Sequence, residues 1–274
     1  VEAGLRTDNL AAPFPEEANR QLISRIASLH LAPTPGAAAA LRRECLPIPE
    51  VHVTGNTVVD ALQWMVTKLP ADGAPPPPMP GEAAADLSRF TDPRRRVVLI
   101  TGHRRESFSG GLVAVCGGIA RLAGQFPETD FVYPVHLNPA VQKATAGVLG
   151  GLQNVHLIAP VGYARSVWLV RRSTFVITDS GGLQEEAPAL GKPVLVTRES
   201  TERPEGVEAG CALLIGYDVE ALVARASEWL ADPAALARHT PQQSPYGDGL
   251  AGLRVVAAVR RRLGLATQAV EAWP

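Results

Sequence analysis

Residues 175–196 constrain the fold of this chain more than any other stretch. Residues 175–178 form a short apolar run rich in β-branched side chains, which is typical of a buried parallel strand. The tight turn at 179–182 follows, then a segment with helical spacing that ends at Gly191, then a second apolar run at 194–196. The stretch therefore predicts a strand, a turn, a helix and a second strand, which is the repeating unit of an α/β fold.

The turn itself predicts an anion site. Ser180, Gly181 and Gly182 lie where the carboxyl end of the strand meets the amino end of the helix. The first N–H groups of a helix lack intrahelical acceptors, the helix dipole favours an anion, and glycine lets a phosphate approach the main chain. Glu185 and Glu186 follow within reach of sugar hydroxyls beside such a phosphate. An ordinary βα turn with solvated glutamates has the same local sequence, so the stretch alone leaves both readings open.

The alternation of strand and helix continues through the second half of the chain. Strands are predicted at residues 96–101, 130–135, 155–158, 175–178, 194–196 and 212–215, and helices at 111–124, 140–149, 162–172, 183–190 and 219–230. Repeated βαβ units predict a doubly wound parallel sheet, which binds ligands at the carboxyl ends of its strands. His103, His136 and Ser180 each follow a strand end, so we expect them to converge on one rim.

The first part of the chain predicts a shorter series of elements. A helix begins near residue 16 and is followed by a second at 35–45, a strand at 51–54 and a third helix at 57–68. Helical spacing predicts that the core face of the first helix carries Leu22, Ile23, Ile26 and Leu29.

Three stretches bear on the boundaries. Residues 1–4 look like the end of a strand, so we expect the first strands of a longer protein to be missing from this sequence. Residues 69–93 contain a run of four prolines and predict a stiff, exposed connector close to a domain boundary. The amphipathic, basic helix predicted at 250–263 either packs on the sheet or crosses back to the first domain as a hinge.

Composition excludes several classes of function. Lys+Arg 26 against Asp+Glu 27 give a net charge of -1, which provides no reason to expect a nucleic-acid or anionic-membrane surface. No apolar run approaches the ~18 residues that would indicate a membrane span. Cys45, Cys116 and Cys211 form no C-x-x-C pair, which argues against a zinc site or a disulfide framework and favours a reducing, cytoplasmic setting. We expect neither a metal nor a cofactor.

Glu2, Glu16 and His103 are the ionisable residues that we expect to carry chemistry. The glutamates lie on loops that close the first half, where a carboxylate can act as general acid or base if its pKa is raised. Each could equally be a helix cap or a surface acid. His103 titrates near neutrality, and the two arginines that follow it can neutralise a diphosphate. The Asp-Ser-Gly-Gly turn lacks the G-x-S-x-G pattern of a nucleophile elbow.

Eight segments occur in order along nearly the whole chain. They are Val-Glu-Ala-Gly-Leu-Arg-Thr at 1–7, Pro-Phe-Pro-Glu-Glu-Ala-Asn-Arg at 13–20, Thr-Gly-Asn-Thr-Val at 54–58, Thr-Gly-His-Arg-Arg-Glu at 101–106, Tyr-Pro-Val-His-Leu-Asn-Pro at 133–139, Thr-Asp-Ser-Gly-Gly-Leu-Gln-Glu-Glu-Ala-Pro at 178–188, Thr-Glu-Arg-Pro-Glu at 201–205 and Pro-Tyr-Gly-Asp-Gly at 245–249. One such segment is weak evidence, but eight in this order are specific. Together they resemble the non-hydrolysing UDP-N-acetylglucosamine 2-epimerases of bacteria, except in the connector and the last dozen residues.

The resemblance implies a fold and a reaction. The fold class is α/β of the glycosyltransferase-B type, with two Rossmann-like, doubly wound domains and the nucleotide sugar between them. The expected division is an incomplete N-terminal domain at 1–58, a UDP-binding domain at 59–248 that includes the connector, and a returning helix at 249–274. The reaction interconverts UDP-N-acetylglucosamine and UDP-N-acetylmannosamine by elimination and re-addition of UDP. The resemblance also implies a homodimer that supplies cell-surface polysaccharide synthesis.

The resemblance assigns roles residue by residue. Catalytic positions match Glu2, Glu16 and His103. Positions that bind UDP match Ser180, Gly181, Gly182 and Glu186, with Glu186 on the ribose and Arg20 a weaker match for substrate contact. Positions that touch a second, activating UDP-N-acetylglucosamine match Arg104 and His136. Among the departures, Ser244 stands where many members have Asn, and the family's Gly-rich opening loop, substrate arginine, further catalytic Asp and allosteric glutamines have no counterpart in this sequence.

Other functions stay open. A glycosyltransferase of the same fold would use the same UDP-binding residues but move the sugar to an acceptor. A nucleotide-sugar-binding fragment would bind UDP without turnover, and little activity is expected if the sequence is the whole polypeptide. A hydrolysing epimerase would release free N-acetylmannosamine.

Overall fold

The computed structural model describes residues 1–44, 50–82, 85–102 and 110–273. Its helices are α1 (Glu16–Ile26), α2 (Pro35–Arg43), α3 (Thr57–Val66), α4 (Gly111–Gln125), α5 (Pro139–Leu149), α6 (Tyr163–Arg172), α7 (Gly181–Ala189), α8 (Pro204–Glu208), α9 (Val219–Ala231), α10 (Pro233–His239) and α11 (Ala251–Arg262), with a 3-10 turn, η1, at Ser88–Phe90. Its strands are β1 (His30–Ala32), β2 (Val51–Val53), β3 (Arg96–Thr101), β4 (Thr129–Pro134), β5 (Val155–Ile158), β6 (Phe175–Thr178), β7 (Val194–Val196) and β8 (Ala212–Leu214). No helix in these residues is both long and apolar enough to cross a membrane.

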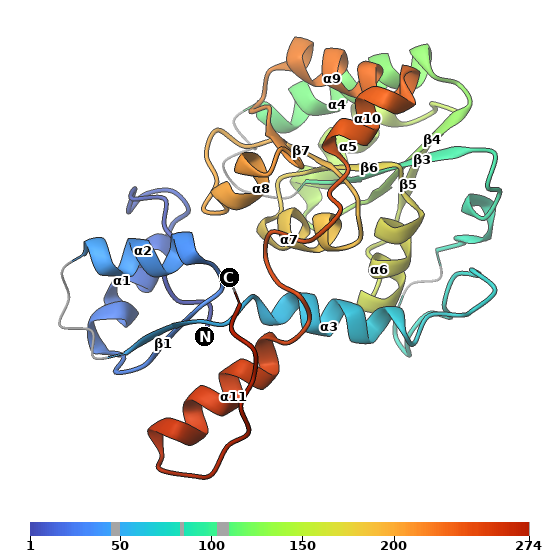
Figure 1. The fold of residues 1–274 in the computed structure, drawn as a ribbon. Helices are drawn as coiled ribbons and strands as arrows, with labels where there is room; N and C mark the ends of the chain where they lie inside the picture. The colour runs from blue at the N-terminus through green and yellow to red at the C-terminus, as the bar shows by residue number, and fades with distance from the viewer. Residues whose placement is uncertain (45–49, 83–84, 103–109, 274) are drawn as a thin grey trace.

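Six parallel strands form the centre of the larger part of the molecule, in the order β5-β4-β3-β6-β7-β8. Apolar side chains of α4, α5 and α9 pack on one face of the sheet, and those of α3, α6 and α7 pack on the other (Figure 1). A fully parallel sheet needs both faces covered, which explains why its strands are almost continuously apolar. The prediction of a doubly wound α/β fold is confirmed.

The strand order reverses between β3 and β6, and this places the site. The chain passes from β3 outward to β4 and β5, then returns to β6 and continues to β7 and β8 on the other side. At the carboxyl ends of the two central strands, Thr101 and Thr178 are paired in register and their hydroxyl oxygens lie 2.5 Å apart. The loops that follow two such strands diverge, and the crevice between them is where parallel sheets bind ligands.

A small lobe, residues 1–53, lies beside this large lobe (blue in Figure 1). β1 pairs in parallel with β2, and α2 packs on them through Ala37 and Ala38. Residues 1–4 contain a turn at residues 3 and 4 and no strand, although the Ala3 amide donates to the Leu31 carbonyl at 3.0 Å.

The predicted core face of α1 is wrong. Leu22, Ile23 and Ile26 are 65%, 58% and 84% exposed, because in the described part of the chain no element covers that face. The helix packs instead through its polar side: Glu17 is fully buried, where it accepts hydrogen bonds from the Thr7 amide and from Gln21.

The connector at 69–93 is also less exposed than predicted. Leu87 and Phe90 are 1% exposed and belong to the core between α3, α6 and the sheet. The Trp168 indole donates to the Gly73 carbonyl at 2.9 Å, and Arg172 donates to the Phe90 carbonyl at 2.6 Å. The buried side chains of Leu87 and Phe90, with these two hydrogen bonds from α6, therefore attach the connector to the large lobe.

α11 packs along α3 and not on the six-stranded sheet (Figure 1). Asp60 of α3 caps its amino end, accepting from the amides of Ala251 at 3.1 Å and Gly252 at 2.7 Å. Arg254 reaches the Thr54 carbonyl at 3.1 Å. The helix therefore contacts the junction between the lobes, while its role as a hinge and the predicted domain boundaries remain predictions.

Truncating Phe90 tests the role of the connector. Phe90→Ala should lower the free energy of unfolding by about 3 kcal/mol or more, because it leaves a cavity beside the His156 ring, 5.2 Å away between centroids. Denaturant unfolding measures this, with Met79→Ala, at a 63% exposed connector position, as the matched control. A loss below about 0.5 kcal/mol, the range of ordinary surface substitutions, would show that the connector is not part of the core.

Candidate functional site

The site begins where β6 passes into α7. The Ser180 amide donates to the Thr178 hydroxyl at 2.9 Å, and this hydrogen bond stabilises the turn. Of the three amides at Ser180, Gly181 and Gly182, the first therefore already has an acceptor within the protein. Gly181 and Gly182 are the first two residues of α7, and their N–H groups have no acceptor within the helix. The dipole of α7 adds positive potential at the same point.

An arginine that the sequence analysis did not single out lies against this turn. A Cβ built on Gly181 would be 2.6 Å from Nη1 of Arg203, so only glycine allows the guanidinium to lie there. The absence of a side chain at Gly181 therefore makes room for the Arg203 guanidinium against the backbone of α7. At Gly182 the space is open, with the Ser180 hydroxyl 4.0 Å from a built Cβ. The signal in the sequence was the Thr-Glu-Arg-Pro-Glu segment, which carries Arg203 but gives no role for it.

Two carboxylates fix Arg203. Its Nε donates to Glu185 Oε1 at 2.6 Å, and its Nη1 donates to Glu202. Glu202 also accepts from Arg198 at 2.9 Å. Burial disfavours the charge on Glu202, but the guanidinium groups of Arg203 and Arg198 outweigh burial and lower the pKa of Glu202 to about 2.

The cluster continues across to the small lobe. Arg20 Nη2 of α1 lies 3.7 Å from Glu202 Oε1. Burial raises the pKa of Glu185, and the negative charge of Glu2 adds to that rise, which places Glu2 on the same side. Glu16 is exposed at the first residue of α1, on the same helix as Arg20. The Glu202 contact of Arg20 and the charge of Glu2 on Glu185 connect these two residues to the large lobe, whereas a place for Glu16 in the site stays a prediction.

Glu186 lies one turn into α7, on its half-buried side. Burial raises the pKa of Glu186 from 4.5 to about 7, and the Tyr163 hydroxyl, at the start of α6, opposes the rise by donating a hydrogen bond. Burial, together with the charge of Glu186, raises the pKa of Tyr163 to about 12. A carboxylate and a phenol beside the Gly181 turn can hydrogen-bond to hydroxyl groups of a ligand.

The remaining predicted residues follow β3 and β4. His136 is exposed just beyond β4, and its Nδ1 accepts from the Asn138 amide at 3.1 Å. His103 and Arg104 lie outside the described residues. The roles of all of these residues stay predictions.

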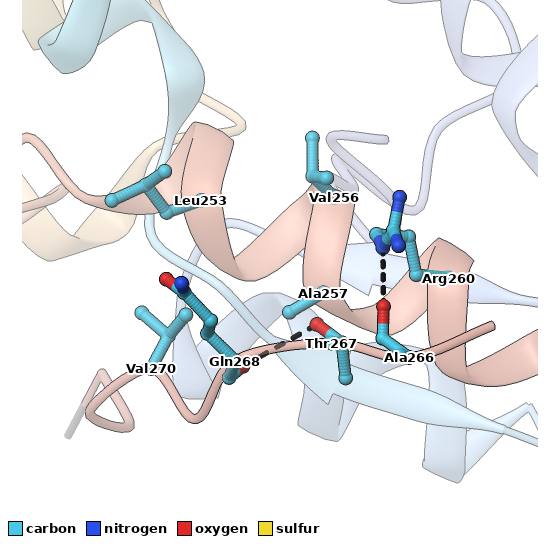
Figure 2. Close-up of a pocket in the computed structure, with 8 residues that line it drawn as sticks. All are labelled: Leu253, Val256, Ala257, Arg260, Ala266, Thr267, Gln268 and Val270. Atoms are coloured by element: carbon cyan, nitrogen blue, oxygen red, sulfur yellow. Dashed lines mark hydrogen bonds between the residues drawn. The ribbon is translucent and has the colours of Figure 1, made fainter.

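A cavity of about 290 Å³ lies at the junction of the lobes, lined by Arg6 and Asp8 of the small lobe and by Glu202 of the large lobe. A cavity of about 130 Å³ lies within the small lobe and is lined by Glu2 and Arg20. A larger cavity, of about 420 Å³, lies elsewhere, between α11 and the carboxyl-terminal segment (Figure 2). Its lining is mainly apolar and holds one charged side chain, Arg260, which donates to the Ala266 carbonyl at 2.6 Å. In the described part of the chain, no three His, Cys, Asp or Glu residues are grouped as metal ligands.

Comparison with known proteins now decides the family. Residues 1–260 match the UDP-N-acetylglucosamine 2-epimerase family. The chain belongs to this family.

Known epimerases of the family resemble the chain in sequence and in fold. The UDP-N-acetylglucosamine 2-epimerase of Yersinia pestis is 45% identical over 260 residues, which are 95% of this chain and 68% of that protein. The Neisseria meningitidis epimerase, solved with UDP-GlcNAc, superposes with a TM-score of 0.88 at 39% identity, covering 95% of this chain and 69% of that one. S. aureus MnaA, solved with UDP, gives 0.89 at 36% identity, covering 100% and 71%. The predicted glycosyltransferase-B-like fold of this epimerase-family chain is confirmed.

Titration of Glu186 gives a pH test of its environment. Folded Glu186 holds its proton up to about pH 7, whereas the unfolded chain releases it near pH 4.5, so ionisation costs stability as pH rises between these values. The stability of wild type relative to Glu186→Gln should therefore fall by about 1–3 kcal/mol from pH 5 to pH 8, measured by urea unfolding.

The matched control is Glu128→Gln, at a carboxylate that is 90% exposed. The burial of this carboxyl group would be contradicted if the free energy of unfolding of wild type, relative to that of Glu186→Gln, stayed constant or increased from pH 5 to pH 8.

Proposed function

We propose that this protein interconverts UDP-N-acetylglucosamine and UDP-N-acetylmannosamine. The single observation that carries the proposal is the Arg203 guanidinium, held over Gly181 at the amino end of α7 by Glu185 and Glu202. Helix dipole, free amides and arginine suit a diphosphate. That the related Neisseria and S. aureus proteins were solved with UDP-GlcNAc and UDP supports this ligand.

In the proposed complex, each group at or near the amino end of α7 has one task. The amides of Gly181 and Gly182 and the Arg203 guanidinium bind the diphosphate, with Ser180 beside it. Glu186, one turn further along, accepts hydrogen bonds from the ribose hydroxyls. Arg20 contacts the substrate from the opposite lobe.

The proposed reaction breaks two bonds and makes them again. A base removes the proton from C2 while the bond from C1 to the UDP oxygen breaks, which gives 2-acetamidoglucal and UDP. Return of the proton to the other face of C2, with re-formation of the C1–oxygen bond, gives the epimer, so atoms and charge are conserved. Negative charge develops on the departing UDP, where Arg203 and the α7 dipole stabilise it. Glu2, Glu16 and His103 are the proposed proton donors and acceptors.

The same resemblance supports three further parts of the proposal. Arg104 and His136 bind a second, activating UDP-N-acetylglucosamine. The protein assembles as a homodimer, and it works in the cytoplasm, to which its widely spaced cysteines without a C-x-x-C pair are suited.

Incubation with UDP-N-acetylglucosamine alone tests the proposed reaction. We expect UDP-N-acetylmannosamine to form without an acceptor, followed by proton NMR of the anomeric region. No change without an acceptor would indicate a transferase, free N-acetylmannosamine a hydrolysing epimerase, and UDP binding without product an inactive binding protein.

Glu16→Gln and His103→Ala should each abolish epimerisation with the fold intact, whereas Glu208→Gln, at an exposed position, should keep the wild-type rate. Wild-type rates in the first two variants would contradict their assignment.

Removal of the guanidinium tests the anion site directly. Arg203→Gln should raise the Kd for UDP at least about tenfold, because a charged hydrogen-bond donor beside the α7 amides is lost. Arg203→Lys should recover part of the affinity, since it restores the charge without the planar guanidinium. Calorimetry gives the Kd, and Arg121→Gln, at an exposed arginine of α4, is the control. A change below about twofold in Arg203→Gln would place the diphosphate elsewhere.

A further inference from the structure

A buried tyrosine connects the site to the junction of the lobes. Tyr246, in the Pro-Tyr-Gly-Asp-Gly segment, is 1% exposed. Its hydroxyl oxygen accepts the Gly206 amide at 2.9 Å and donates to the Arg203 carbonyl at 3.3 Å. One side chain therefore holds both ends of the turn that leads from Arg203 into α8.

The space around the hydroxyl is closed. A Cβ at Gly206 would lie 2.6 Å from the Tyr246 oxygen, so glycine is required for the phenol to reach the backbone. Burial, with the nearby charge of Glu205, raises the pKa of Tyr246 well above its usual range, so the phenol keeps the proton that it donates.

The other side of the segment is attached to the small-lobe junction. The Tyr246 carbonyl accepts from the Asn56 amide at 2.7 Å. Two residues further on, Asp248 accepts two hydrogen bonds from Arg254, at 2.7 and 2.6 Å, and Arg254 also donates to the Thr54 carbonyl. The backbone of Tyr246 is thus fixed to the loop before α3, while its phenol is fixed to the loop that carries Arg203.

The loop that Tyr246 holds has polar contacts in both lobes. Arg203 lies over Gly181 of α7, Glu202 is 3.7 Å from Arg20 of α1, and Glu205 accepts from the Thr34 hydroxyl at the start of α2. A shift of the loop by a fraction of an ångström would change the position of the guanidinium relative to the α7 amides, and geometry of that order decides the strength of anion binding.

We propose that Tyr246 is a positioning residue for the diphosphate site: its hydroxyl holds the Arg203–Gly206 turn so that the Arg203 guanidinium and the α7 amides bind the same anion. This rests on the proposed function, since it takes UDP as the ligand. The phenol itself touches no substrate atom and acts through Arg203.

The test is a double-mutant cycle on UDP binding. Tyr246→Phe should raise the Kd for UDP about fivefold or more in calorimetry. In an Arg203→Gln background the same substitution should change the Kd by less than about 1.5-fold, because the residue through which it acts is gone. Ser173→Ala, which removes a buried hydroxyl that donates to the Val170 carbonyl at the end of α6, should leave the Kd unchanged.

Each outcome decides the inference. An unchanged Kd in Tyr246→Phe, or an equal fivefold loss in both backgrounds, overturns the positioning role while the proposed function stands. Failure of the wild type to bind UDP overturns the proposed function, and hydrogen exchange then decides the role of Tyr246. Faster exchange of the Gly206 amide in Tyr246→Phe, with exchange in β3 and β6 unchanged, supports a role in holding the turn, and unchanged exchange overturns it.

Discussion

The structure at the junction of the lobes depends on the buried charge of Arg203. A guanidinium that is 8% exposed must be compensated, and removal of either partner of a buried pair leaves a charge that costs several kcal/mol. Glu185 and Glu202 compensate it from two different segments, α7 and the loop after β7. The positions of both segments are therefore tied to one another through a single side chain.

This constraint explains how the site is arranged. The reversal of strand order between β3 and β6 opens a crevice, and Arg203 adds a fixed cation to the helix end that faces it. Glu202 extends the network to Arg20, so a charge on the large lobe is balanced partly by a residue of the small lobe. A diphosphate bound there would meet the amides of α7 and the Arg203 guanidinium, and in the proposed site Glu2 and Glu16 come from the small lobe. Separation of anion binding from proton transfer is what elimination of UDP requires.

Much of the large lobe could be predicted from the sequence, whereas several contacts of the site could not. Strands such as 96–101 and 175–178 were predicted at their observed bounds, because short β-branched runs between turns have few other solutions. The role of Arg203 depends on Glu185, 18 residues away, and no local pattern reports such a pairing. The exposed face of α1 shows the same limit, since helical spacing identifies an apolar face but not what covers it.

In the proposed complex, UDP is bound by the first amides of α7 together with Arg203. NMR of the protein labelled with ¹⁵N at glycine, which gives 25 glycine amides, can detect this contact during a titration with UDP. We expect the amide resonances of Gly181 and Gly182 to move most, and to move far less in Arg203→Gln. Shifts confined to other glycines, with these two unmoved at saturation, would contradict this mode of binding.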